Sequence, residues 1–375
     1  MPARLGYRPA LDGIRALAIA LVVLHHTGAL LVPSLADELF PGGFLGVNVF
    51  FVLSGFLITT LLLERRGVEP HPIRTFYARR ALRLLPAVVG LLVAILVYAL
   101  AVDSGVSRAL ASLPVVLTYT TNWAALAGVD VSQYIGHLWS LAIEEQFYLV
   151  WPLLLFAGFR AGCSRRQLLW LVLGLAVVAA AWRASLWDTG HGWLRIYIRT
   201  DAQADSILIG AALALLPYKR LLDAGRTATR AGIAWLALAG IVAAAELVQP
   251  WSGTLYLGGF TVLAVVAAVL IALVLRPGAG PYRLLASAPA VALGRLSYSL
   301  YLWHFPVFLV VAQRTADWTP ALRVLVAWPI AFGAAVASYR LLERPALHIK
   351  ARLGPRPAPP PSGPPAERRV APART

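Results

Sequence analysis

Side chains that could carry out acid–base chemistry lie inside apolar segments of this chain. The first of these segments, "LDGIRALAIALVVLHHTGALLV" at 11–32, contains Asp12, Arg15, His25 and His26. Eleven residues turn an α-helix through about 1100°, within ~20° of three full turns. Arg15 and His26 therefore share one face, ~16 Å apart along the axis, while His25 points ~80° away. A buried arginine costs at least ~2.5 kcal/mol unless it meets a partner or water, so we interpret the aligned pair as functional.

A structural explanation is the alternative for this segment. Arg15 would extend to the inner membrane interface, and the histidines would be hydrogen-bonded core residues. Asp12, three residues before Arg15, can pair with it on a helix in either case.

Two further segments combine charge with a position at or inside an apolar run. In "FYARRALRLLP", Arg80 and Arg83 lie three residues apart and face the same way on a helix. Two guanidinium groups at the mouth of a span suit a phosphorylated ligand, although basic residues also anchor helices at the cytoplasmic face. In "HLWSLAIEEQFYLVWP", Glu144 and Glu145 lie inside a span, where one of them can pair with His26 or with an arginine.

Polar residues in three other stretches are further candidates. "RTDAQADSILIG" brings Arg199 and Asp201 to the outer mouth of a span, and "LGRLSYSLYLWHFPVF" places His304 near mid-membrane. "GGFLGVNVFFVLSGFLIT" contains Asn48 among small residues. Each has a structural alternative: an ion-paired rim, a hydrogen-bonded core histidine, and close helix packing through glycine. No metal site is expected, because the adjacent histidines of the first segment diverge on a helix.

These residues belong to a chain with the composition of a membrane protein. Of 375 residues, 59% are hydrophobic and 13% are charged, and the mean hydropathy is +0.72. A soluble chain is about a quarter charged. Recurrent long apolar stretches therefore predict an all-α polytopic membrane protein. The net charge of +16 does not indicate a nucleic-acid partner, because most arginines lie in loops between apolar segments.

We predict ten transmembrane helices with both termini in the cytoplasm. The predicted spans are 11–32, 43–63, 82–103, 138–159, 167–187, 203–217, 232–248, 255–275, 294–313 and 320–342. Lys and Arg concentrate in alternate loops, which stay cytoplasmic. This alternation holds only if the short apolar segment 109–122 does not cross. We expect 1–352 to form one membrane-embedded domain and the Pro-rich 353–375 to be a disordered cytoplasmic tail.

Together these residues resemble the acyltransferase-3 family, integral-membrane enzymes that O-acylate cell-envelope polysaccharides, lipids or secreted metabolites. The resemblance covers about 1–345. The family's R-x10-H signature matches Arg15 and His26, and its R-x-x-R element matches Arg80 and Arg83. The stretches "GGFLGVNVFFVLSGFLI", "LWSLAIEEQFYL", "RTDAQADSILIG" and "LSYSLYLWHFPVF" also look like family blocks.

The resemblance implies an acyl-CoA donor, usually acetyl-CoA, reached from the cytoplasm of a bacterium whose inner membrane holds the protein. We expect Arg80 and Arg83 to bind phosphates of the donor. Arg15 would continue that positive path or stabilise the oxyanion that develops on the thioester carbonyl. His26 would be the general base, and Glu145 could orient it.

The acceptor implied by the resemblance is a hydroxylated glycan, glycolipid or secondary metabolite. We expect Arg199, Asp201, His304 and Asn48 to contribute to its binding. Many family members have Asp where this chain has Asn48, so a charge at that position is not essential here. A covalent route through His26 would give ping-pong kinetics.

A secondary transporter or flippase of an envelope precursor is the competing hypothesis. Transporters also bury charges near the midplane, often in broken helices at matching places in two halves. The sequence has no convincing internal symmetry, and the spacing of Arg15 and His26 has no obvious reading as a transport site. We therefore expect an enzyme.

Overall fold

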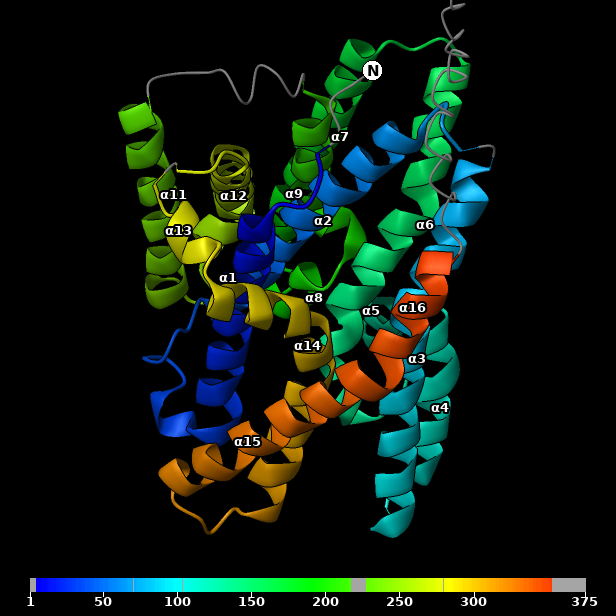
Figure 1. Ribbon diagram of the computed structural model, residues 1–375. Helices are drawn as coiled ribbons and strands as arrows, with labels where there is room; N and C mark the ends of the chain where they lie inside the picture. The colour runs from blue at the N-terminus through cyan, green and yellow to red at the C-terminus, as the bar shows by residue number, and fades with distance from the viewer. Residues whose placement is uncertain (1–4, 70, 103, 217–226, 279, 353–375) are drawn as a thin grey trace, which may run out of the picture.

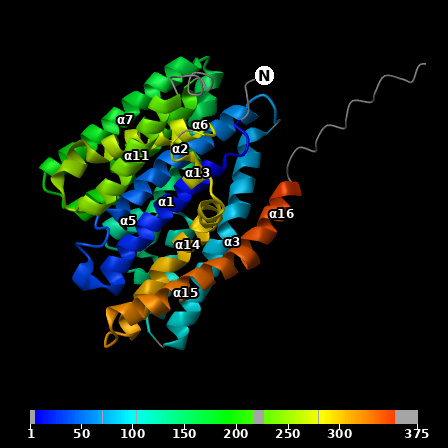
Figure 2. The same ribbon diagram turned by 60° about the vertical axis from the view of Figure 1, so that its left-hand side comes forward.

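The computed structural model describes residues 5–69, 71–102, 104–216, 227–278 and 280–352 (Figures 1 and 2). Those ranges are helical, without a strand, and contain nine helices long and apolar enough to cross a membrane. The prediction of an all-α polytopic protein is confirmed. The nine are built on α1 (Pro9–His26), α2 (Gly46–Arg65), α3 (Pro72–Ala101), α6 (Trp139–Arg160), α7 (Arg165–Asp188), α11 (Thr227–Leu247), α12 (Phe260–Val274), α14 (Ala288–Arg314) and α15 (Pro320–Ser338).

The predicted span 203–217 corresponds to α9 (Thr200–Leu215), which is not among the nine, whereas α12 reaches spanning length only together with the helical turn Leu255–Gly259 before it. The 16 residues of α9 rise only ~24 Å, against the ~30 Å of a hydrocarbon core. Most of α9 is buried, and it packs on α2, α7 and α12. Because protein surrounds it, α9 does not need the length of a lipid-facing span. A tenth crossing and the cytoplasmic position of both termini stay predictions.

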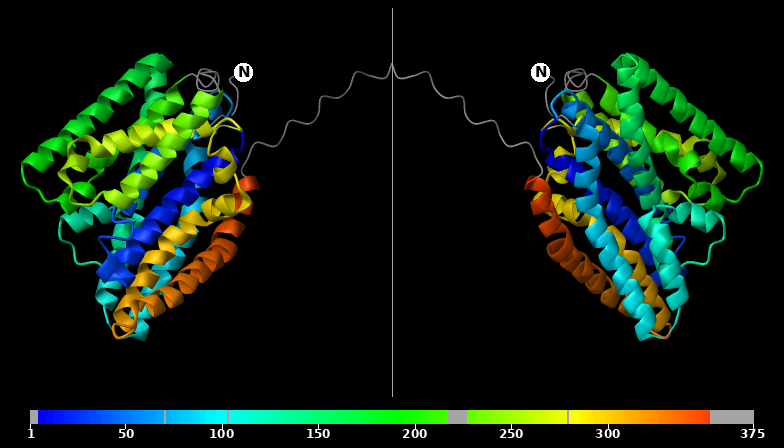
Figure 3. Two further views of the ribbon diagram at one scale, coloured as in Figure 1. Left: turned by 90° about the vertical axis from the view of Figure 1, so that its left-hand side faces the viewer. Right: turned by 90° about the vertical axis from the view of Figure 1, so that its right-hand side faces the viewer.

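The segment 109–122 folds mostly into α4 (Val106–Leu117), with Pro114 inside it. Its twelve residues rise only ~18 Å, which is too short for α4 to cross the membrane by itself. This agrees with the prediction that the segment 109–122 does not cross. The remaining short helices are α5 (Thr121–Leu126), α8 (Trp193–Tyr197), α13 (Tyr282–Leu285) and α16 (Arg344–Arg352). In the side views of Figure 3 the long helices lie roughly alongside one another. The predicted tail 353–375 lies outside the described residues.

Glycine allows α2 and α9 to approach closely. A Cβ added to Gly55 would lie 2.0 Å from the carbonyl oxygen of Ile207, and one added to Gly210 would lie 2.0 Å from that of Val52. No side chain larger than hydrogen fits such contacts without moving the backbone. Small residues at helix interfaces of membrane proteins serve this purpose. Gly55, in the second predicted span, thus allows close helix packing, as the structural alternative for that span proposed.

A fully buried ion pair joins α7, α9 and α12. Arg183 donates to both carboxylate oxygens of Asp205, at 2.7 and 3.0 Å, and neither side chain is exposed. Arg183 also donates to Thr261 at 2.8 Å and to the carbonyl of Ala202 at 2.8 Å. The charges therefore have hydrogen-bonded partners, which burial demands. We therefore interpret this network as structural, because it holds the three helices together.

Candidate active site

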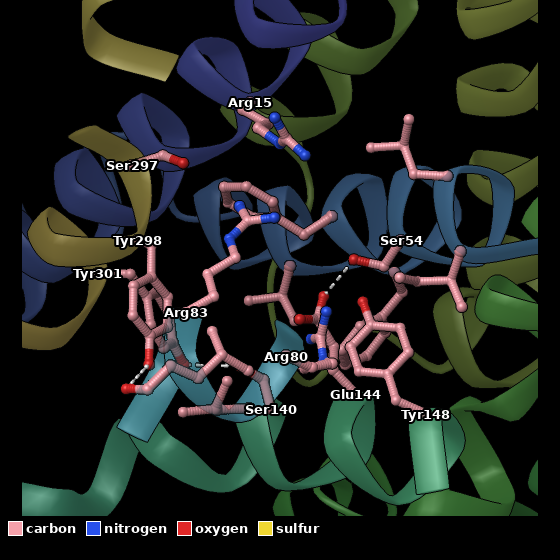
Figure 4. A pocket seen from close by; sticks show the side chains of 17 residues that line it. Arg15, Ser54, Arg80, Arg83, Ser140, Glu144, Tyr148, Ser297, Tyr298 and Tyr301 are labelled. Carbon is pink, nitrogen blue, oxygen red and sulfur yellow. Dashed lines mark hydrogen bonds between the residues drawn. The ribbon is translucent and has the colours of Figure 1, made fainter. Parts of the chain in front are cut away.

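A cavity of about 830 Å³ opens between α1, α2, α3, α6 and α14 (Figure 4). Residues three or four apart on a helix share a face, so each helix presents one row of side chains to the cavity. We call it the arginine cavity. Its polar lining consists of Arg15, Ser54, Arg80, Arg83, Ser140, Glu144, Tyr148, Ser297, Tyr298 and Tyr301.

Three arginines reach this cavity, and two of them have ionic partners. Arg15 donates to Asp12 at 2.7 Å, as the spacing on the helix predicts. The Nε atom of Arg80 lies 3.0 Å from both carboxylate oxygens of Glu145. Arg83 has no hydrogen bond or ion pair with any residue that the structure describes. Figure 4 shows the side chains of Arg15 and Arg83 extending into the cavity, where Arg83 is available to an anionic ligand.

The adjacent glutamates have different partners. Glu144 lines the cavity and accepts a hydrogen bond from Ser54 at 2.8 Å. Glu145 accepts from Arg80, whose guanidinium carbon also lies 3.4 Å from the ring centroid of Tyr148. The sequence offered an arginine or His26 as partner for one of these carboxylates. In the structure Glu145 pairs with an arginine, Arg80. Consecutive helical residues point ~100° apart, so only one of the two glutamates faces the cavity.

Three histidines from different segments form a second group beside the cavity. The Nδ1 atom of His26 lies 2.9 Å from the Nε2 atom of His304 on α14. His137, just before α6, has its ring centroid 5.7 Å from that of His304. The regular α-helix of α1 ends at His26, and a π-helical turn, Thr27–Leu31, follows. Such turns are frequent at functional sites. We call His26, His137 and His304 the histidine cluster.

Tyr301 lies at the boundary between the arginine cavity and the histidine cluster. It lines the cavity, whereas His26 is absent from the lining. The ring centroid of Tyr301 is 5.2 Å from that of His137 and 5.8 Å from that of His304. Its hydroxyl is 2.6 Å from that of Ser140 and donates to the carbonyl of His137. The cavity and the cluster are therefore neighbours with a hydrogen-bonded wall between them.

The residues expected to bind an acceptor lie in separate places. Arg199 donates to both oxygens of Asp201, at 2.9 and 2.6 Å, and Trp182 donates to the same carboxylate at 2.9 Å. This is the ion-paired rim considered as the structural alternative. Asn48 is 1% exposed and donates to Gln203 at 3.0 Å, bridging α2 and α9. His304 belongs to the histidine cluster and is fully buried.

Several residues at the site were not among the predicted site residues, although helical spacing points to them. Ser140 and Tyr148 lie four residues before and after Glu144, and all three line the arginine cavity. Tyr301 lies three residues before His304 on α14. His137 has no such signal, because its neighbours come from α1 and α14, which only the fold brings together.

Known proteins resemble this chain over most of its length. The family model described as "Acyltransferase domain" matches residues 8–340. The peptidoglycan O-acetyltransferase OatA of Listeria monocytogenes is 31% identical over 356 residues, covering 90% of this chain and 56% of its own length. YrhL of Bacillus subtilis, named as a candidate peptidoglycan O-acetyltransferase, is 33% identical over 358 residues, covering 90% and 55%. A Staphylococcus aureus protein named as a candidate O-acetyltransferase is 30% identical over 356 residues, covering 91% and 58%.

The chain spans a little over half the length of these curated relatives. No solved structure matches it significantly. The matched range contains both the arginine cavity and the histidine cluster. The resemblance to integral-membrane acyltransferases is thereby confirmed. On the match to the family model, the chain belongs to the acyltransferase-3 family.

Proposed function

We propose that this protein is a membrane-bound O-acetyltransferase that moves an acetyl group from acetyl-CoA to a hydroxyl of an envelope glycan. The observation that carries the proposal is the arginine cavity, which adjoins a cluster of histidines. The cavity suits a phosphorylated donor, and an imidazole suits proton transfer from an acceptor hydroxyl.

The charge of the cavity supports an anionic donor. Arg83 has no hydrogen bond or ion pair in the part of the chain that the structure describes, and a guanidinium binds phosphate through two parallel hydrogen bonds. A second opening of about 590 Å³ shares Arg15, Arg83, Ser297 and Tyr298 with the arginine cavity. Arg83 therefore lines both spaces, which supports an elongated donor that contacts its guanidinium.

In the proposed reaction His26 removes the proton from the acceptor hydroxyl as its oxygen attacks the carbonyl carbon of the thioester. The new C–O bond forms, the C–S bond breaks, and the proton passes from His26 to the departing thiolate. Arg15 stabilises the oxyanion on the carbonyl. Tyr301 lines the cavity and contacts His304, the neighbour of His26, so in this reaction the acetyl end of the donor passes beside the Tyr301 side chain.

The acceptor that we propose is peptidoglycan or a precursor of it, in the cytoplasmic membrane of a bacterium. The support is the similarity to the Listeria relative, a peptidoglycan O-acetyltransferase. A glycolipid or a secondary metabolite with a free hydroxyl would fit the same chemistry.

The experiment reconstitutes the purified protein with radiolabelled acetyl-CoA and peptidoglycan fragments, and follows the label into the glycan. We expect labelling with wild type, loss with His26→Ala, and a raised KM for acetyl-CoA with Arg83→Ala. Arg314→Ala is a matched control, because this exposed arginine bonds Tyr98 away from the cavity. Equal labelling in His26→Ala would overturn the assignment of the base. Labelling from another acetyl donor alone would overturn acetyl-CoA, and glycan flux without acetylation would favour a transporter.

A further inference from the structure

We propose that His304 is a positioning residue that holds His26 in a single tautomer, with the lone pair of His26 on Nε2. This inference rests on the proposed function, in which His26 is the general base. It specifies which atom of His26 accepts the proton and what keeps that atom unprotonated between turnovers.

The backbone of α14 fixes the proton of His304. The Nδ1 atom of His304 lies 2.9 Å from the carbonyl oxygen of Leu300, one helical turn earlier. A carbonyl oxygen only accepts, so Nδ1 must carry the hydrogen. His304 is fully buried and has no carboxylate among its described contacts, which disfavours a charged ring. A neutral imidazole has one N–H, and the Nε2 atom of His304 therefore carries a lone pair.

His304 in turn determines which ring nitrogen of His26 carries the proton. The Nε2 atom of His304 is 2.9 Å from the Nδ1 atom of His26. Because the Nε2 atom of His304 carries only a lone pair, the Nδ1 atom of His26 must donate its N–H to it. The remaining nitrogen of His26, Nε2, is left as the basic atom. In a histidine the bond made by one ring nitrogen determines which tautomer the other presents.

Aromatic contacts hold the two rings in this geometry. Phe305 meets the ring of His26 edge-on at 5.1 Å between centroids, and Phe308 meets His304 at 5.9 Å and 90°. His25 is next to His26, but its Nδ1 atom lies near the carbonyl of Phe40, at 3.4 Å. Among the described residues, His304 provides the one hydrogen bond to the ring of His26.

This arrangement also explains why His304 does not serve as the acceptor-binding residue expected from the sequence. Both of its ring nitrogens are engaged, one by Leu300 and one by His26. The side chain has no exposed surface. A substrate hydroxyl would therefore have to displace one of these bonds before it could bind.

Two substitutions separate positioning from packing. Gln at position 304 can accept the N–H of His26 through its side-chain oxygen, whereas Leu of similar size cannot. We expect His304→Leu to lower kcat by ~100-fold or more, the scale of a misoriented base, with the KM for acetyl-CoA unchanged. His304→Gln should keep kcat at least ~10-fold above His304→Leu. Equal kcat values in folded variants, or a change confined to KM, would overturn the inference.

A second measurement does not depend on turnover. Diethyl pyrocarbonate acylates an unprotonated imidazole nitrogen, and mass spectrometry reports the rate at each histidine. We expect His26 to react more slowly in His304→Leu than in wild type or His304→Gln, with His25 unchanged as the internal control. An unchanged rate at His26 would overturn the inference, provided that melting temperature and elution volume show a folded protein. The expected rates without acetyl transfer in any variant would support the positioning role and count against the proposed function alone.

Discussion

Arg83 differs from the other arginines of the cavity in having no hydrogen bond or ion pair within the described residues. We expect Arg83→Ala to raise the KM for acetyl-CoA by ~10- to 100-fold, which corresponds to the ~1.5–3 kcal/mol of hydrogen bonds to a charged group. Arg83→Lys should recover only part of this loss, because an ammonium keeps the charge but not the planar fork. Steady-state kinetics with varied donor measure both. Unchanged KM in Arg83→Ala would remove Arg83 from the donor site.

At the scale of single residues, the sequence predicts which side chains share a helix face but not which helices meet. Arg15 reaches the cavity, and Arg80 and Arg83 line it together, as their spacing indicates. Glu145 pairs with Arg80 because α6 lies close to α3. The hydrophobic periodicity of a sequence does not predict which helices lie close together. The neighbour of His26 is His304, 278 residues away in the chain. The sequence therefore predicts pairs within one helix, such as Arg15 with Asp12, but not pairs between helices.

The close approach of α2 and α9 leads to a prediction about glycine. A methyl group at position 210 would lie 2.0 Å from the carbonyl oxygen of Val52, so the helices would have to move apart. We expect Gly210→Ala to lower the free energy of unfolding by ~1–3 kcal/mol, the usual cost of overpacking. Thermal melting in detergent measures the change. Gly174→Ala is the matched control, because nothing lies within 4 Å of its added Cβ. Equal melting of the two variants would contradict the close packing.

The buried pair between α7 and α9 leads to a second prediction at this scale. Arg183→Leu should destabilise the protein by ~3–5 kcal/mol, because Asp205 would be left as an uncompensated charge. The double variant Arg183→Leu/Asp205→Leu should recover much of the loss, since an apolar pair of similar volume is often neutral or stabilising. The midpoints of thermal unfolding separate the two cases. A double variant no more stable than the single one would show that the other bonds of Arg183 matter more than the charge.

The sequence predicts the membrane-spanning helices correctly where a segment is both apolar and long enough to cross a membrane. The long spans correspond to helices of the structure, and α4 is as short as the loop charges require. Hydropathy alone does not separate α9 from a lipid-facing span, because a helix enclosed by protein is equally apolar. The π-helical turn after His26 has no sequence signal, since it depends on how α1 packs against α14.

For the molecule as a whole, the orientation in the membrane stays a prediction, and the chain offers a direct probe of it. Cys163 is the only cysteine, half-buried in the loop between α6 and α7, and the basic residues Arg160, Arg165 and Arg166 lie at the helix ends on either side of it. We expect a membrane-impermeant maleimide to leave Cys163 unlabelled in spheroplasts and to label it after lysis, because basic loops stay inside.

Cys163→Ser/Ser252→Cys is the control for that labelling. Ser252 lies in the loop 249–254, which has no charge and which we predict to be outside. This variant should be labelled in intact spheroplasts. Labelling of Cys163 before lysis would reverse the predicted topology, and with it the side from which the donor enters.

The wall at Tyr301 has a consequence for the energetics of the cell. A membrane that stores a proton gradient must be an electrical insulator, and water-filled spaces with titratable groups are the usual routes of leakage. Here the lining of the arginine cavity includes Tyr301, whose hydroxyl is already bonded to Ser140 and to the backbone of His137. Without that wall, the cavity would open directly onto imidazole rings able to carry protons onward. Under the proposed function, the side chain beside the path of the acetyl group therefore also separates the cavity from groups that could conduct protons.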